Sequence, residues 1–289
     1  MIQMEIIKAD HFATCFGVER ALNLANQHLH DQSSPVYSYG QLIHNNDVLK
    51  RLSQQGLKII RNLEELASIK KGKLIIRSHG APKAVYDYCA INHIELIDAT
   101  CPKVKRIHKI VETCCEQSHN VIVFGDKMHP EVIGIMGWCV DKAIVCQDLE
   151  EYKQVEDHLY KKQCIVFQTT FNINQSQLIK EYFHNGNNSD IIVKDTICNA
   201  TDLRQQAARK LAVQCDSVLV IGGKQSSNTK KLYEISKEFC ENSFWIENSN
   251  EIPYNLINKT KKLGITAGAS TPSQIVEEVI FNVREKRNA

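Results

Sequence analysis

The chain has 289 residues, 43% of them hydrophobic and 24% charged, an ordinary composition for a globular protein and a length that suits two or three domains. Its 35 Lys and Arg residues nearly balance its 33 Asp and Glu residues, which gives a net charge of +2 and does not favour a nucleic-acid or membrane-surface partner. We expect no signal peptide and no membrane span, because the first residues lack a long apolar run and the apolar runs farther along are short.

The eleven cysteines are many for such a chain, and their number is odd. A small secreted protein held together by disulfides would be shorter and richer in turns, so we expect a reducing, cytoplasmic location. Cys114 and Cys115 are neighbours that cannot both face one metal from a helix, so we expect them to serve in packing.

In chain order, nine segments each combine a short β-branched strand, a loop and a longer amphipathic stretch. They cover residues 4–29, 35–56, 73–89, 94–115, 120–139, 164–183, 190–212, 217–236 and 262–283. This alternation predicts an α/β protein with largely parallel strands.

The nine segments form three thirds that are in phase, which predicts three small α/β domains over residues 1–100, 101–196 and 197–289. The first strand has two expected places, in its own third or packed onto the third domain. Ligands bind open parallel sheets where strands hand over to helices, so three such domains in a pseudo-threefold arrangement would bring their turns to one central cavity. The turns carry matching groups: Cys15, Cys101 and Cys198 after the first strands; His44, His129 with Glu131, and Ser226-Ser227-Asn228 after the second; His79, Thr169 and Ser270 after the third.

One cysteine from each domain could together hold a metal centre. A closed zinc site needs four ligands, and a four-iron cluster normally uses four thiolates, so three cysteines would leave one iron open to a substrate. Pro102 suits the first turn of a helix behind Cys101, and a helix start behind each thiolate would stabilise an anionic centre. The alternative is that the three cysteines only pack in the core.

Two turns, GGKQSSN and TAGASTP, combine glycines with hydroxyl groups at expected helix starts. Such turns present N–H and hydroxyl donors to phosphate, although neither matches a Walker loop or a complete dinucleotide fingerprint. Together with the three histidines at matching turns, they indicate a diphosphate pocket. For the serines, the alternative is ordinary helix capping. Glu131 is a candidate acid, and its alternative is an acidic residue that only stabilises the start of a helix.

The fragments DATCP, HPEVIGIMG, QTT, SSN and TAGAS, in this order and over essentially the whole chain, resemble the 4-hydroxy-3-methylbut-2-enyl diphosphate reductase (IspH/LytB) family. The resemblance implies an iron–sulfur reductase that converts this allylic diphosphate to isopentenyl and dimethylallyl diphosphate by two-electron reductive dehydroxylation. That reaction is the last step of the methylerythritol phosphate pathway. It further implies one [4Fe–4S] cluster with an open iron site, and electrons supplied by ferredoxin or flavodoxin.

By motif match, the resemblance implies a role for each residue at the turns. The cluster ligands would be Cys15, Cys101 and Cys198; the diphosphate would be held by His44, His79, Ser226, Ser227, Asn228 and Ser270. His129 would contact the substrate, Glu131 would supply protons, and Thr169 would orient the substrate hydroxyl and relay protons. One departure is Ala13-Thr14 before Cys15, where the family usually has Gly-Phe.

Two other functions fit the same features. Quinolinate synthases and diphthamide-synthesis proteins also combine three domains with one cysteine each, and would perform other chemistry. A non-catalytic regulator that binds a phosphosugar or nucleotide, with packed cysteines, would contain no iron.

Overall fold

A computed structural model describes residues 4–12, 14–31, 33–139, 143–159, 161–186, 190–257 and 260–288. Within these residues, the strands form three separate four-stranded sheets in which the paired strands are parallel. The chain divides into two compact units. Unit 1 holds residues 1–18, 44–47 and 199–289, and unit 2 holds residues 19–43 and 48–198.

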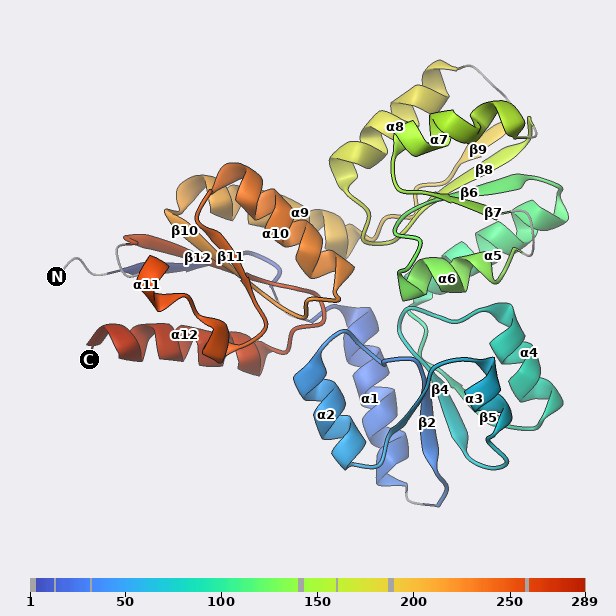
Figure 1. Ribbon diagram of the computed structural model, residues 1–289, viewed down its shortest axis with the longest axis horizontal. Helices are drawn as coiled ribbons and strands as arrows, with labels where there is room; N and C mark the ends of the chain where they lie inside the picture. The colour runs from blue at the N-terminus through green and yellow to red at the C-terminus, as the bar shows by residue number, and fades with distance from the viewer. Residues whose placement is uncertain are drawn as a thin grey trace. The chain divides into compact units, whose positions relative to one another are not determined.

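Unit 1 contains one sheet, in the order β1-β12-β10-β11. Its strands are β1 (Glu5–Lys8), β10 (Ser217–Ile221), β11 (Ser243–Ile246) and β12 (Lys262–Ala267). On one face lie α9 (Asn199–Gln214) and α10 (Ser227–Phe239); on the other lie α11 (Tyr254–Ile257) and α12 (Ser273–Asn288) (Figure 1). Alternate side chains of β10 serve the two faces, as a strand buried on both sides requires: Val218 and Val220 pack under α9 and α10, while Leu219 and Ile221 pack under α12.

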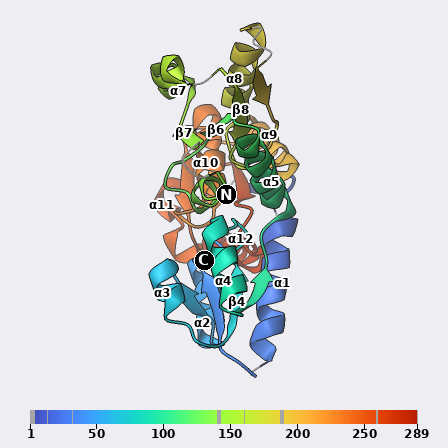
Figure 2. The same ribbon diagram turned by 90° about the vertical axis from the view of Figure 1, so that its right-hand side faces the viewer.

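The first sheet of unit 2 has the order β3-β2-β4-β5. Its strands are β2 (Val36–Tyr39), β3 (Lys58–Ile60), β4 (Lys73–Ile76) and β5 (Glu95–Asp98). Figures 1 and 2 show α1 and α4 on opposite sides of β4; the helices around this sheet are α1 (Phe16–His30), α2 (Asn46–Gln54), α3 (Leu63–Ala67) and α4 (Lys83–Ile91). Leu74 and Ile76 of β4 point toward α3 and α4, where they meet Leu66 and Val85.

The second sheet of unit 2 has the order β7-β6-β8-β9. Its strands are β6 (Asn120–Phe124), β7 (Ala143–Cys146), β8 (Gln163–Phe167) and β9 (Ile191–Val193). One face packs against α5 (Pro102–Glu116) and α6 (Pro130–Met136), and the other against α7 (Leu149–Val155) and α8 (Ile173–Asn185). Short 3-10 turns follow α7 at Glu156–His158 and β11 at Ser249–Glu251.

The α/β class with parallel strands is confirmed, but the expected nine strands are twelve among the described residues. The strands that the sequence did not predict are β3, β7 and β11, one edge of each sheet. They are only three or four residues long, and β3 has two exposed residues, so they carry neither a buried run nor a clear alternation.

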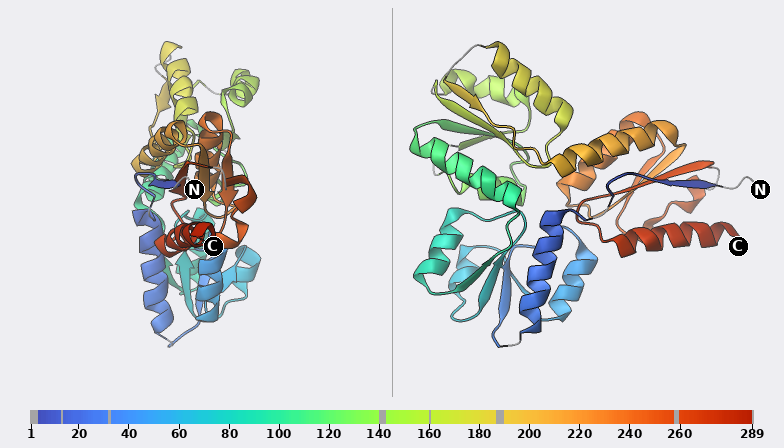
Figure 3. Two further views of the ribbon diagram at one scale, coloured as in Figure 1. Left: turned by 90° about the vertical axis from the view of Figure 1, so that its left-hand side faces the viewer. Right: turned by 180° about the vertical axis from the view of Figure 1, so that it is seen from behind.

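The first strand lies in the sheet of unit 1, which is the second of the two places expected for it. Figure 3 shows β1, in blue, beside the red β12, with which it pairs in register from Glu5 opposite Lys262 to Lys8 opposite Ile265. β1 thereby takes the edge position that β5 and β9 take in the other two sheets. The fourth strand of every sheet therefore leads into one of the three segments that carry Cys15, Cys101 and Cys198.

Cys114 and Cys115, both expected to serve in packing, behave differently. Cys114 is buried, and its Sγ lies 2.8 Å from that of Cys164 on β8. Cys115 forms a disulfide with Cys139, which corrects the packing role for this residue. Among the described residues, no helix combines the length and the apolar character needed to cross a membrane.

Candidate active site

Glu131 and Thr169 form a buried acid–hydroxyl pair in unit 2. Glu131 lies in the first turn of α6 and is 1% exposed. The Thr169 N–H donates to Glu131 Oε1 and the Thr169 hydroxyl donates to Oε2, both at 2.6 Å. Burial raises the pKa of Glu131 to about 7, against the lowering effect of the two Thr169 donors. The carboxyl group can therefore hold and release a proton near neutral pH.

Two histidines lie beside this pair. His129 caps α6, because its Nδ1 accepts a hydrogen bond from the Glu131 N–H at 3.1 Å. The imidazole ring of His79, in the loop after β4, meets that of His129 edge to face with centroids 5.3 Å apart. The expected substrate-binding histidines of unit 2 thus lie next to the expected acid.

A glycine allows the end of α6 to lie against the loop after β4. A Cβ at Gly137, just after α6, would lie 2.4 Å from Pro82 Cβ. The end of α6 and the loop after β4 are also joined by a hydrogen bond from the Lys83 N–H to the Gly137 carbonyl at 3.3 Å. Only a residue without a side chain allows this contact.

The two candidate ligand cysteines of unit 2 each form a backbone hydrogen bond to a neighbouring loop. The Cys198 N–H donates to the Thr169 carbonyl at 3.0 Å, and the Cys101 N–H donates to the Ser78 carbonyl at 2.9 Å. Cys101 stands directly before α5, with Pro102 in the first helical turn as expected. No local pattern in the sequence indicated Ser78, which is buried and contacts Cys101 through its backbone.

Unit 1 brings together the remaining candidates. The Cys15 N–H donates to the Ala269 carbonyl at 3.0 Å, and the Ser270 hydroxyl donates to the His44 carbonyl at 3.3 Å. A Cβ at Gly223 would lie 2.5 Å from that same His44 oxygen. The two glycine-containing turns and the His44 segment are therefore in direct contact.

The start of α10 has the predicted serine cap and also a buried amide donor without an acceptor among the described residues. Ser226 is the cap, and its Oγ accepts a hydrogen bond from the Thr229 N–H at 3.2 Å, so this serine has the capping role that was the alternative to anion binding. Ser227 is half-buried, while Asn228 is buried and its Nδ2 has no acceptor among the described residues. A buried donor without a partner is costly unless a ligand supplies one.

The thiols fit an iron–sulfur group by their number and placement. Four of the described cysteines outside the disulfide are half-buried rather than buried: Cys15, Cys101, Cys198 and Cys215. The first three each directly precede a helix, where an anionic group is stabilised. Burial raises the pKa of Cys215 to about 11, so this fourth thiol is a poor thiolate donor. Ala13, whose effect on Cys15 was left open, lies outside the described residues.

The repeated sheets, the thiols before three helices and the buried acid–hydroxyl pair define a class of three-sheet α/β proteins that carry thiols and a buried carboxyl group at the ends of their strands. The sequence model described as LytB protein matches residues 6–284. The chain belongs to the LytB family.

Named relatives agree with this assignment. The chain is 41% identical to the 4-hydroxy-3-methylbut-2-enyl diphosphate reductase of Caldanaerobacter subterraneus subsp. tengcongensis over 283 residues, 97% of each chain. It is 39% identical to the enzyme of the same name from Clostridioides difficile, over 96% of this chain and 98% of the relative.

Solved structures show the same fold. A structure of (E)-4-hydroxy-3-methyl-but-2-enyl diphosphate reductase, described as the terminal enzyme of the non-mevalonate pathway, aligns with a TM-score of 0.68 and 38% identity, over 98% of this chain and all of the other. The E-1-hydroxy-2-methyl-but-2-enyl-4-diphosphate reductase of Plasmodium falciparum aligns with a TM-score of 0.89 and 25% identity, over 96% and 87%.

Proposed function

We propose that this chain reduces (E)-4-hydroxy-3-methylbut-2-enyl diphosphate to isopentenyl and dimethylallyl diphosphate, with loss of the hydroxyl group as water. The observation that carries the proposal is the buried Glu131 carboxyl group, bound by both donors of Thr169, whose carbonyl in turn holds Cys198. Removal of a hydroxyl group needs a proton source and an electron source side by side, and this chain of contacts provides a place for both.

Cys15, Cys101 and Cys198 would hold a [4Fe–4S] cluster and leave one iron open. When bound, the cluster supplies a Lewis acid and a store for electrons delivered by an external ferredoxin or flavodoxin. The three thiols fit this role because they are neither in a disulfide nor buried. Each also follows the fourth strand of a sheet and precedes a helix.

The chain's own residues would handle the proton. Glu131, with its pKa raised to about 7 by burial, holds a proton at the carboxyl group near neutral pH. The Thr169 hydroxyl donates to that carboxyl group and can also accept a hydrogen bond. Thr169 can therefore orient the substrate hydroxyl and pass the proton to this hydroxyl. His129 would contact the same end of the substrate.

The diphosphate would be bound by the hydroxyl, amide and imidazole groups of the turns. The Nδ2 donor of buried Asn228, which has no acceptor in the part of the chain that the structure describes, lies at the start of a helix of 13 residues and suits a phosphate oxygen. Ser226, Ser227, Ser270, His44 and His79 complete the proposed set.

The test is anaerobic purification with iron and acid-labile sulfide assays, followed by turnover with dithionite and a viologen dye. We expect iron and sulfide in the protein and formation of the two five-carbon diphosphates. A protein that holds the cluster but does not convert the substrate overturns the proposal. Cys101→Ser is expected to remove most of the iron, whereas Cys215→Ser serves as the matched control and is expected to retain it.

A further inference from the structure

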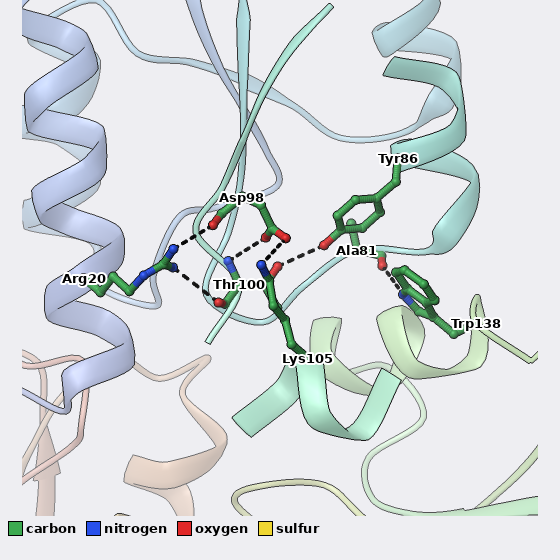
Figure 4. Close-up of polar contacts among 7 residues, drawn as sticks. All are labelled: Arg20, Ala81, Tyr86, Asp98, Thr100, Lys105 and Trp138. Atoms are coloured by element: carbon green, nitrogen blue, oxygen red, sulfur yellow. Dashed lines mark hydrogen bonds and ion pairs between the residues drawn. The ribbon is translucent and has the colours of Figure 1, made fainter. Parts of the chain in front are cut away.

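Arg20, on α1, binds the backbone segment that leads into Cys101. Its Nη2 donates to the Asp98 carbonyl at 3.0 Å and its Nη1 donates to the Thr100 carbonyl at 3.4 Å (Figure 4). A guanidinium group is a rigid planar fork, so two bonds from one group fix both the place and the direction of the segment they hold. The two carbonyls belong to the residues one and three positions before Cys101.

The same segment is held from its other side. The Tyr86 hydroxyl and Thr100 Oγ1 lie 3.0 Å apart, and Thr100 is fully buried. The Thr100 N–H donates to Asp98 Oδ1 at 2.9 Å, while Asp98 Oδ2 pairs with Lys105 Nζ at 2.6 Å (Figure 4). Lys105 lies in the first turns of α5, so these contacts connect the residues before and after Cys101.

The surroundings leave this segment little room to shift. Trp138 donates from Nε1 to the Ala81 carbonyl at 3.0 Å (Figure 4) and stacks on His108 of α5 with ring centroids 5.0 Å apart. A Cβ at Gly80 would lie 2.5 Å from His108 Cε1 and 3.3 Å from Thr100 Cγ2. Side chains packed this tightly transmit a displacement of the backbone instead of absorbing it.

We propose that Arg20 is a positioning residue for Cys101: by holding the carbonyls of Asp98 and Thr100, it fixes the backbone from which the thiol projects. This role rests on the proposed function, in which Cys101 is a cluster ligand. Arg20 contacts neither the thiol nor a substrate in this scheme, so it acts through the backbone, and Tyr86 supports it through Thr100.

The experiment compares Arg20→Lys, Arg20→Ala and Tyr86→Phe with the wild type. Arg20→Lys keeps the charge but cannot span both carbonyls. Arg51→Lys, an exposed arginine near the end of α2, is the matched control. Each protein is reconstituted with iron and sulfide under anaerobic conditions. The rate of iron transfer to a ferrous chelator and the electron paramagnetic resonance spectrum of the reduced protein are then recorded.

Thermal unfolding of each apo-protein is measured alongside the rate of Cys101 alkylation by iodoacetamide, read by peptide mass spectrometry. We expect both Arg20 variants to lose iron about tenfold faster than the wild type or more, as for the loss of a charge-assisted hydrogen bond. Their spectra should be altered, and alkylation of Cys101 in their apo-forms should be faster. Tyr86→Phe should shift the same readouts by a smaller factor, and Arg51→Lys should leave them unchanged.

The outcomes separate the two proposals. A wild type that holds iron, with Arg20→Lys and Tyr86→Phe equal to it in iron loss, spectrum and alkylation, overturns the role of Arg20 and leaves the proposed function standing. A wild type that never takes up iron overturns the proposed function, and the alkylation rates alone then decide whether Arg20 positions the thiol. If Arg20→Ala unfolds, Tyr86→Phe carries the test through the same segment.

Discussion

Cys198 and Thr169 are joined through their backbones, because the Cys198 N–H donates to the Thr169 carbonyl at 3.0 Å. Thr169 directs its own N–H and hydroxyl to the Glu131 carboxyl group. One threonine therefore connects a proposed cluster ligand to the proposed proton donor.

Glu131→Gln is expected to retain the cluster and substrate binding but to lose turnover by about 100-fold or more, as for removal of a general acid. The amide keeps the shape of the carboxyl group but cannot deliver a proton. Steady-state turnover with a viologen donor, together with the iron content, measures this. Glu116→Gln, on the exposed end of α5, is the control. Near wild-type turnover in the Glu131 variant would mean that Glu131 only stabilises the start of α6 and does not supply protons.

Glu131 should also make stability depend on pH. Burial raises its pKa from 4.5 to about 7 in the folded protein, so between these values the folded state binds more protons than the unfolded state. The contribution of Glu131 to the free energy of unfolding should therefore fall as pH rises through this window, by up to about 3 kcal/mol, and level off above it. Denaturant unfolding of the wild type and of Glu131→Gln from pH 4.5 to 8 measures this contribution as the difference between the two proteins. Equal slopes in the two proteins would mean that the carboxyl group stays charged.

Thr169→Val should move the pH profile of activity. The Thr169 hydroxyl lowers the pKa of Glu131, so its removal should raise that pKa further and shift the upper limb of the kcat/KM profile to higher pH. The rate should also fall, because valine cannot orient a substrate hydroxyl. Thr169→Ser keeps the hydroxyl and should restore both the position and the height of the profile. A valine variant with an unshifted profile would mean that the Thr169 hydroxyl takes no part in the proton transfer.

Asn228→Ala should weaken substrate binding without weakening the fold. The buried Nδ2 of Asn228 has no acceptor among the described residues, so the free protein loses no hydrogen bond from this atom. We expect the affinity for the substrate and for inorganic pyrophosphate to fall about tenfold, with the melting temperature unchanged or raised. Calorimetric titration and thermal unfolding measure the two effects. Asn242→Ala, whose exposed amide donates to the Asp216 carbonyl, should show no loss of affinity.

His108 should oppose Glu131 in acid. Burial lowers its pKa from 6.5 to about 4, so between these values the unfolded state binds more protons. Its contribution should therefore be lost as pH falls from 6.5 to 4, by about 3 kcal/mol. His108→Phe should remove this dependence, and any constant packing cost cancels in the difference between pH values. Urea unfolding at pH 4.5 and 7 tests it; an unchanged difference would mean that His108 is protonated in the folded state.

The sequence predicted the central strands well because each carries a buried β-branched run, as β6 and β10 do. It missed edge strands such as β3, where only Ile60 is buried, and it did not decide between two places for β1. The pairing of β1 with β12 joins residues about 260 positions apart, and local periodicity carries no information on such a partner.

The site divides in the same way. Residue types at strand ends predicted Glu131, Thr169 and the histidines, because chemistry at a sheet edge follows from the chain order of its strands. No role for Arg20 was predicted, because its partners, Asp98 and Thr100, lie 78 and 80 positions away. The Asn228 Nδ2 donor, which has no acceptor among the described residues, could not be predicted either, since a missing hydrogen bond is visible only once the packing around it is known.

The place of β1 has a consequence for biosynthesis. The sheet of unit 1 combines β1, which precedes every strand of unit 2 in the chain, with β10, β11 and β12, which follow them all. During synthesis β1 therefore cannot pair with β12 until both sheets of unit 2 have left the ribosome. A slow-folding passenger fused ahead of Met1 would hinder the return of that strand, whereas the same passenger placed after Ala289 would only delay it.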